Sequence, residues 1–370
     1  MKKIFIFSIL INSICLSVFA QQSESEDYHS EDLIPVATFD KSMAIGLSVT
    51  SDNRVFVAFP NYNGVGKYTL TEEKNGELMP YPNEAWNTKG EYSEHLLRVQ
   101  DLYVDSDDFL WVLDSKPASK GSIFGDAGKS QAGQFKLVKI NTKTDEVAKV
   151  YLFEDLDKSA SGLNDIRVDT EKELAYLSDP GQAAIVVLDL KTGKSRSVLA
   201  KTKFTLADKN LVLNYSGTEM KSKDSKAFSS NVNGIALTKD FKYLYFKPIN
   251  KLNLFRIKTK YLANANLSEK ELAKKVEDVG KVGVTHGLAA DDKGNIYLTT
   301  SINYTISYVT PEGELHTLVQ DSRLLWPDSL GTGSDGYLYF TCAQLQRLSQ
   351  WNNGVDKTEY PYTMYKVKLP

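Results

Sequence analysis

The chain has 370 residues and a formal net charge of −3 at pH 7, with 42% hydrophobic and 25% charged residues. These are ordinary values for a folded globular protein. A slightly acidic chain lacks the basic surface that nucleic-acid binding requires, so we expect no nucleic-acid partner.

The N-terminus has the pattern of a secretory signal peptide over residues 1–20. Lys2 and Lys3 give a charged start, residues 4–16 are apolar, and a small-residue cleavage site ends at Ala20. A membrane anchor is the alternative, but the apolar run is shorter than the ~20 residues that a span needs. We therefore expect a secreted protein, extracellular or periplasmic, with no membrane span.

The polar, acidic segment QQSESEDYHSED at residues 21–32 predicts a disordered spacer, which leaves residues 33–370 for the folded domain. Cys15 is removed with the signal peptide, so Cys342 is the single cysteine of the mature chain and no intrachain disulfide can form. Cys342 lies in an apolar segment and is expected to be a buried small hydrophobe.

One hairpin pattern then occurs six times. Each copy has a small or acidic residue, an apolar strand, a polar turn and an aromatic-rich strand, as in HGLAADDKGNIYLTTS from His286. The other copies are GLSVTSDNRVFVAF, DLYVDSDDFLWVLD, DIRVDTEKELAYLSD, GIALTKDFKYLYFKP and SLGTGSDGYLYFTC, which begin at Gly46, Asp101, Asp165, Gly234 and Ser329. They recur at intervals of roughly 40–70 residues, and a repeat of this length is typical of a propeller blade.

Further alternating segments between the copies supply a third and a fourth strand, for example QFKLVKINTKTDEVAKVYLF from Gln134 and AAIVVLDLKTGKSRSVLA from Ala183. The sequence therefore predicts an all-β, six-bladed β-propeller. This also explains a length above the roughly 100–200 residues of a typical domain. A β-sandwich of unrelated hairpins is the alternative, but it would not need the same hairpin six times.

The last blade has only three strands of its own, the third at residues 362–369. We expect residues 34–39 to supply the fourth strand, so that the N-terminal strand joins the C-terminal blade and closes the ring. Closure removes the exposed sheet edges that would otherwise promote aggregation.

Three segments interrupt the blade pattern. Residues 116–134 are rich in Gly, Ser and Ala and form either a lid over a site or a slack loop. Residues 201–230 are expected to cover the crossing from blade three to blade four. Residues 267–276 predict a short surface helix, with Ser268 as N-cap and Glu271 three residues later.

Several segments resemble, in chain order, the signature segments of the Yellow/major royal jelly protein family. They are FPNYNGVGKYTL, ELMPYPNEAWN, LLRVQDLYVDSDDFLWVLDS, KLVKINTKTDEVAKVYLF, LNDIRVD, AYLSDPG and LLWPDSL. The sequence departs from the family at Asn61, where an Arg is usual, and at Lys116, where a Gly commonly follows LWVLDS. The resemblance implies a secreted six-bladed propeller that binds a small aromatic, amine or quinone-type ligand. Some members of the family convert dopachrome-like compounds.

Polar residues stand directly before or at the start of the repeated hairpins, where the innermost strands of a propeller begin. The six repeats bring these positions into one ring around the central channel, which is the default ligand pocket. They are Gln100, Asn164, Asn233, His286 and Asp328. The alternative is that these side chains only hydrogen-bond neighbouring blades and trapped water.

We assign His286 and Asp328 as the catalytic candidates and Gln100, Asn164, Asn233 and Trp326 as the ligand-binding candidates. An imidazole with a pKa near 6.5 suits the proton transfers of a tautomerase. Asp328 would anchor an amine or orient the imidazole. Trp326, Tyr62 and Phe124 would stack on a planar ligand.

Two further functions stay open. Asn233-Gly234 and Pro327-Asp328 resemble steps of gluconolactonase-type propellers, so Asn164, Asn233 and Asp328 would hold Ca²⁺ or Mg²⁺ in a metal-dependent lactonase. The third possibility is a non-catalytic scaffold for protein interactions. Under the ligand-binding hypothesis we expect no cofactor, a small-molecule partner and a monomer.

Overall fold

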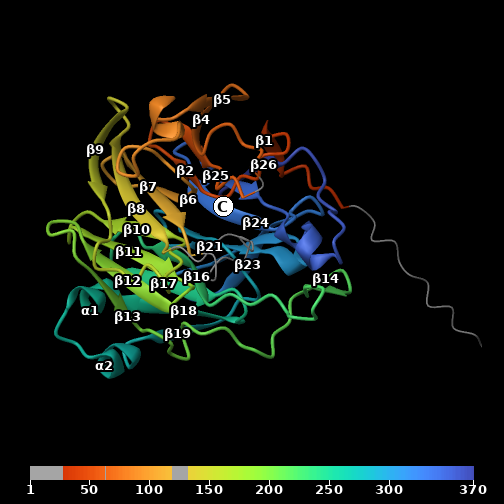
Figure 1. Cartoon of the computed structure of the whole chain (residues 1–370). Helices are drawn as coiled ribbons and strands as arrows, with labels where there is room; N and C mark the ends of the chain where they lie inside the picture. The colour runs from red at the N-terminus through yellow and green to blue at the C-terminus, as the bar shows by residue number, and fades with distance from the viewer. Residues whose placement is uncertain (1–27, 63, 119–131) are drawn as a thin grey trace, which may run out of the picture.

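The computed structural model describes residues 28–62, 64–118 and 132–370. In it, six four-stranded antiparallel sheets are arranged around a common centre (Figure 1). The prediction of an all-β, six-bladed propeller is confirmed. The signal peptide predicted at residues 1–20 lies outside the described residues.

All six repeated hairpins form, and each supplies the inner two strands of one blade. The pairs are β2 (Leu47–Val49) with β3 (Val55–Ala58), β6 (Val99–Val104) with β7 (Phe109–Lys116), β10 (Ile166–Asp169) with β11 (Leu174–Asp179), β16 (Val232–Leu237) with β17 (Tyr243–Pro248), β20 (Leu288–Ala290) with β21 (Ile296–Thr300), and β24 (Pro327–Thr332) with β25 (Tyr337–Cys342).

The outer strands complete the blades. In blades one to five they are β4 (Leu70–Lys74) and β5 (Glu77–Pro80), β8 (Gln134–Asn141) and β9 (Glu146–Tyr151), β12 (Ala184–Asp189) and β13 (Ser195–Val198), β18 (Asn253–Lys258) and β19 (Glu277–Lys281), and β22 (Thr305–Val309) and β23 (Leu315–Gln320). The short helices are α1 (Thr259–Ala263), α2 (Glu269–Ala273) and single 3₁₀ turns at Ala85–Asn87, Ser301–Asn303, Leu345–Arg347 and Ser349–Trp351.

The ring closes as the sequence predicts. In blade six, β26 (Thr363–Lys368) pairs with β25 on one side and with β1 (Ile34–Thr38) on the other. The seam continues one residue further, where the Phe39 amide donates to the carbonyl of Tyr362 at 2.8 Å. Phe39 then packs edge-on against Phe59 of blade one, with ring centroids 5.2 Å apart. This contact joins the first and last blades.

The residues just before β1 differ from the prediction. The Ser30 amide donates to Asp321 at 2.8 Å, and the Ser322 amide donates to the carbonyl of Tyr28 at 2.9 Å. Residues 28–32, the last part of the spacer expected to be disordered, therefore contact the propeller, and residues 21–27 lie outside the described residues. The sequence gives little sign of this, because the partners lie almost three hundred positions away.

The six inner strands form the wall of the channel. Neighbouring inner strands contact each other all the way round, from β2 through β6, β10, β16, β20 and β24 back to β2. Glycines make this close approach possible, because a Cβ on Gly234 would lie 2.2 Å from the His286 carbonyl oxygen and one on Gly287 would lie 1.9 Å from that of Asp328. Glycine at the start of these repeats is therefore needed so that the backbones of neighbouring blades can pack against each other.

The aspartates in the hairpin turns bind the polar atoms of aromatic residues in the second strands. Asp105 accepts a hydrogen bond from the indole of Trp111 at 2.7 Å, and Asp291 accepts one from the hydroxyl of Tyr297 at 2.8 Å. Each carboxylate also accepts a backbone amide of its own turn. An aromatic ring can therefore be buried while its polar atom stays satisfied.

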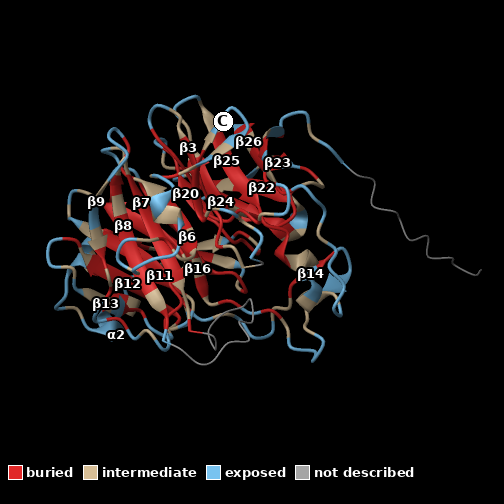
Figure 2. Cartoon of the chain, turned by 45° about the horizontal axis from the view of Figure 1, so that its top comes forward, coloured by how far each residue is buried: buried red, intermediate tan, exposed pale blue. Residues whose placement is uncertain are grey.

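Figure 2 shows that the buried residues follow the strands and the exposed ones follow the loops. Cys342 is buried, as predicted. The helix predicted at residues 267–276 is the shorter α2, and the Ser268–Glu271 capping box is present. Among the described residues, no helix is long and apolar enough to cross a membrane.

The insertion at residues 201–230 reaches further than expected. It contains a small hairpin, β14 (Asn214–Tyr215) with β15 (Thr218–Glu219). The Tyr215 hydroxyl hydrogen-bonds Ser301 of blade five at 2.8 Å, and its ring lies 6.0 Å from that of Trp326. The insertion therefore extends beyond the crossing between blades three and four to blades five and six.

Truncating Phe39 should open the seam. Phe39→Ala removes a buried ring between the first and last blades, and we expect it to lower the free energy of unfolding by about 3–5 kcal/mol in urea denaturation. Ile34→Ala is the matched control, because Ile34 lies in the same closing strand but is 37% exposed. Similar losses for the two variants would show that the seam does not depend on this contact.

A methyl group at Gly287 should disturb the channel wall. Gly287→Ala places its Cβ against the Asp328 backbone, and we expect a loss of about 1–3 kcal/mol or more in denaturant unfolding, since the rigid backbone cannot move away. In Gly162→Ala the new Cβ would meet nothing closer than 3.7 Å. That control should be nearly neutral, and equal stability of both variants would contradict the close approach.

Candidate functional site

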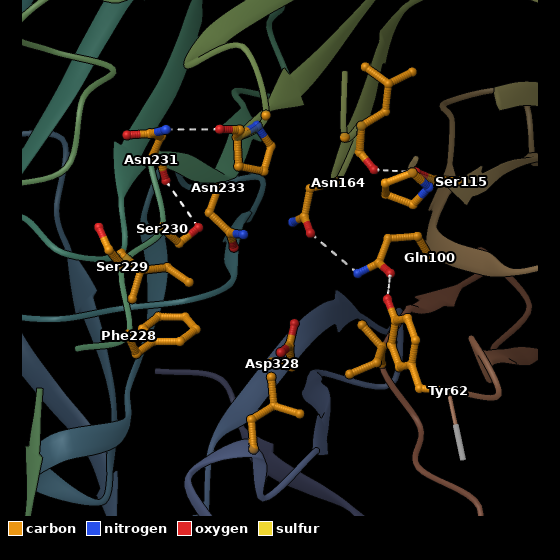
Figure 3. Close-up of a pocket in the computed structure, with 18 of the residues that line it drawn as sticks. Tyr62, Gln100, Ser115, Asn164, Phe228, Ser229, Ser230, Asn231, Asn233 and Asp328 are labelled. Atoms are coloured by element: carbon orange, nitrogen blue, oxygen red, sulfur yellow. Dashed lines mark hydrogen bonds between the residues drawn. The ribbon is translucent and has the colours of Figure 1, made fainter. Parts of the chain in front are cut away.

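A cavity of about 290 Å³ opens where the inner strands begin. Figure 3 shows polar side chains from several blades pointing into it. Its lining combines amides, hydroxyls, one carboxylate and aromatic rings, namely Ile45, Tyr62, Gln100, Ser115, Pro117, Gly162, Leu163, Asn164, Pro180, Gly181, Phe228, Ser229, Ser230, Asn231, Asn233, Ile249, Trp326, Asp328 and Leu345. The propeller thus brings together five of the six predicted site residues; His286 is the one that does not line the cavity.

One wall is a hydrogen-bonded series of side chains from blades one, two and three. The Tyr62 hydroxyl donates to Gln100, whose amide nitrogen donates to Asn164 at 3.3 Å (Figure 3). Asn164 in turn donates to the buried Asp165 at 2.7 Å. These contacts fix the orientation of both amides. The structural role considered for the ring residues therefore applies in part to Gln100 and Asn164.

Asn233 and Asp328 have unused polar atoms. The Asn233 side chain makes no hydrogen bond to any described residue, and Asp328 uses only Oδ2, which accepts from the Trp326 indole at 3.1 Å. Figure 3 shows both side chains directed toward the middle of the cavity. A free amide and a free carboxylate oxygen are therefore available to a ligand.

The pKa of the Asp328 carboxyl group lies near neutral pH. Desolvation raises its pKa to about 7, the hydrogen bond from Trp326 opposes that rise, and the charge of Asp101 adds to it. A carboxyl group in this range can either bind a cation or exchange a proton under physiological conditions.

Two more carboxyl groups lie beneath the cavity floor. Desolvation and the neighbouring Asp101 raise the pKa of Asp165 well above its ordinary value. Desolvation also raises the pKa of Asp101, although its ion pair with Arg167 at 3.0 Å opposes the change. Arg167 continues across the axis to the carbonyl of Leu288, 2.8 Å away. The floor therefore consists of mutually interacting acids crossed by one guanidinium.

His286 lies behind Trp326. The two rings are stacked with centroids 3.7 Å apart, and His286 is 1% exposed. Its Nε2 lies 2.5 Å from the Ser301 hydroxyl, and its Nδ1 has no partner among the described residues. Desolvation, with a smaller effect of Lys247, holds the pKa of His286 well below its usual range. In this arrangement a ligand in the cavity meets the Trp326 ring and not the imidazole.

The backbone of Trp326 explains this placement. Its φ of 54° lies in the left-handed region, which is unusual for a bulky residue. The conformation is held by the stack on His286, by an edge contact with Phe228 at 5.5 Å and by a hydrogen bond from the Ala343 amide. Trp326 thus lines the cavity as an apolar wall, and it also shields His286.

One side of the site was not predicted from the sequence. The residues at positions 228–231, at the end of the insertion, line the cavity opposite Tyr62 (Figure 3). The run FSSN at these positions directly precedes the inner strand of blade four and is rich in small polar residues, which is the only signal that pointed to it. Pro117 also lines the cavity. Residues 119–131, including Phe124, lie outside the described residues, so the lid stays a prediction.

The metal-binding alternative can be compared with the donors present. Asn164, Asn233 and Asp328 line the same cavity, which gives two amide oxygens and one carboxylate. Within residues 28–62, 64–118 and 132–370, no group of three His, Cys, Asp or Glu side chains is placed to hold a metal ion. Hard cations such as Ca²⁺ usually take six to eight oxygen ligands. The donor set is therefore a poor fit to a tightly held divalent cation.

Solved structures with a similar fold include several enzymes. A streptogramin B lyase is 13% identical with a TM-score of 0.52, covering 91% of this chain and 97% of its own. A gluconolactonase from Xanthomonas campestris is 9% identical with a TM-score of 0.53, covering 93% and 97%. A luciferin-regenerating enzyme is 12% identical with a TM-score of 0.52, covering 89% and 92%. At these identities the likeness shows the propeller fold alone.

A comparison with curated proteins found no match. The family model described as major royal jelly protein matches residues 97–370, which include most of the segments that carry the resemblance and every predicted site residue. The match spans blades two to six but not the closing strand β1. The chain therefore belongs to the major royal jelly protein family.

Proposed function

We propose that the cavity binds a small aromatic amine. The observation that carries the proposal is the free Oδ1 of Asp328, the single carboxylate among the cavity-lining residues described. A protonated amine that enters the cavity would pair with this oxygen and lower the pKa of Asp328 by its charge. Charged hydrogen bonds in a desolvated site are stronger than neutral ones, so this pair would set the position of the ligand.

The walls of the cavity suit the rest of such a ligand. Tyr62 and Phe228 lie on opposite sides of Asp328 in Figure 3, and Trp326 forms the wall beside it. Aromatic faces favour a planar ring, and the free amide of Asn233 can bind a ring hydroxyl or carbonyl. The volume of about 290 Å³ lies near the lower end of the range for small-molecule sites, roughly 300–1,000 Å³. A ligand with one or two rings fits these limits.

Isomerase chemistry of the dopachrome-tautomerase type would use Asp328. Isomerisation needs a group that takes a proton and returns it near neutral pH, and Asp328 faces the cavity with a pKa near 7. His286, the original candidate, is covered by Trp326 and is kept neutral. We therefore assign His286 to the support of Trp326 and the proton transfer, where it occurs, to Asp328.

The binding function needs no cofactor. Ca²⁺ or Mg²⁺ enters only under the lactonase alternative, which rests on the propeller fold and on Asn164, Asn233 and Asp328. Lactone hydrolysis that EDTA abolishes would favour that alternative over amine binding. We further propose that the protein is secreted and monomeric, as the signal-peptide pattern of residues 1–20 and the closed ring suggest.

Amine binding should depend on pH through Asp328. For tyramine, we expect calorimetric affinity to rise at least about tenfold between pH 5.5 and pH 8, because the carboxyl group must ionise while the amine stays protonated. Asp328→Asn should bind tyramine weakly at both pH values. The control Asp224→Asn changes an exposed aspartate and should match the parent.

Two results would contradict this assignment. Binding of tyramine that Asp328→Asn leaves intact would place the amine elsewhere, and a neutral probe such as 4-ethylphenol with the same pH dependence would show that charge pairing is not responsible. A protein that binds no aromatic amine at any pH would leave the cavity to another ligand class.

The raised pKa of Asp328 should also appear in the pH dependence of stability. The folded protein retains a proton up to about pH 7, whereas the unfolded chain loses it near pH 4, so this contribution is present at low pH and is lost as pH rises between them. Asp328→Asn removes the effect. In denaturant titrations, its stability relative to the parent should increase by roughly 2–4 kcal/mol from pH 4.5 to pH 8. A constant difference would mean that Asp328 titrates normally.

A further inference from the structure

The opposite end of the channel holds a second, smaller cavity. It lies where the inner strands end, whereas the candidate amine site lies where they begin. Its volume is about 50 Å³. It is lined by Ser48, Val49, Leu102, Tyr103, Val104, Arg167, Leu237, Lys239, Ala289, Ala290, Leu330, Gly331 and Thr332. Arg167 lies between the two cavities, since its guanidinium reaches the carboxylate floor of the first and lines the second.

Two positive charges face this cavity. The Arg167 guanidinium is paired with Asp101 and bound to the carbonyls of Ile166 and Leu288. Lys239 makes no hydrogen bond or ion pair with any described residue. Both basic residues line this one small cavity, and no anionic side chain is among the residues that line it.

Two nearby carboxylates offset part of the positive charge of Lys239 without pairing with it. Desolvation lowers the pKa of Lys239 and the charges of Asp292 and Asp291 raise it, but neither forms an ion pair with it. Asp291 already accepts hydrogen bonds from Asn295 and Tyr297. Asp101 is engaged by Arg167. An anion inside the cavity would therefore meet an ammonium group that has no ion-pair partner among the described residues, next to the Arg167 side chain.

Neutral donors complete the cavity. Tyr103 lines it, and its ring lies 5.6 Å from the Arg167 guanidinium carbon. Desolvation raises the pKa of Tyr103 to about 12, so its hydroxyl stays a donor at neutral pH. The Ser48 hydroxyl oxygen accepts the amide of Val104, which leaves its own proton free to donate. Guanidinium, ammonium and hydroxyl groups are the donors that oxyanions prefer.

We propose that this cavity binds a tetrahedral oxyanion such as phosphate or sulfate, between Arg167 and Lys239. At 10–15 Å³ for each water molecule, the cavity has room for roughly three to five waters, which one such ion can replace. This inference does not depend on the amine site, because the two cavities lie at opposite ends of the channel and have opposite charge preferences.

The test is a calorimetric titration of the full chain with sodium phosphate at pH 7, against sodium chloride at the same ionic strength. We expect saturable one-to-one binding of phosphate, at least about tenfold weaker in Lys239→Gln and undetectable in Lys239→Glu. Lys239 is exposed at the channel mouth, so these variants should fold like the parent. Lys242→Gln is the matched control, because Lys242 is an exposed lysine three positions away that does not line this cavity.

Two outcomes would overturn the proposal. One is phosphate binding that does not saturate or that chloride reproduces, since this would be general screening. The other is equal phosphate affinity in the parent and in Lys239→Gln. Titration with glycerol 3-phosphate distinguishes the source of the anion: tighter binding than inorganic phosphate would identify a phosphate ester, and weaker binding a free ion. Tyramine binding should persist in Lys239→Gln, which separates this test from that of the amine site.

Discussion

The contact between neighbouring inner strands is the constraint on which the remaining structure depends. Gly234 and Gly287 let the backbone of one blade touch the backbone of the next, where any side chain would keep them apart. This distance sets the width of the channel. It also brings the first residues of the inner strands together, so that Asp328 of blade six faces Asn164 and Asn233 of blades three and four.

The segments that resemble the family divide into two groups by what their side chains do. In LWVLDS, Asp114 is fully paired with the buried Lys136 at 2.5 Å and accepts the amides of residues 97 and 98, so it anchors the linker before blade two. In PYPNEAWN, the Asn87 side chain binds backbone groups of strand β4 and of its own segment. By contrast, LLWPDSL contributes Trp326 and Asp328 to the cavity. Two of these three segments therefore hold the fold together, and one lines the cavity.

The fold could be predicted from the sequence because the same hairpin occurs six times and the missing strand of blade six has an obvious source in residues 34–39. The positions of Gln100, Asn164, Asn233 and Asp328 in one ring followed from the same repeat. The relation between Trp326 and His286 did not, because it depends on a positive φ at a tryptophan, which no pattern of residue types indicates. The wall formed by residues 228–231 was missed because an insertion has no periodicity that would place it over the cavity.

Arg167 connects three blades of the ring through its side chain. It starts in blade three, pairs with Asp101 of blade two and reaches the carbonyl of Leu288 in blade five. In addition to the contacts between neighbouring blades, this side chain therefore links non-adjacent blades near the axis. Partial opening at the seam between blades one and six would therefore leave blades two, three and five joined. The same side chain lies between the two cavities, which open at opposite ends of the channel.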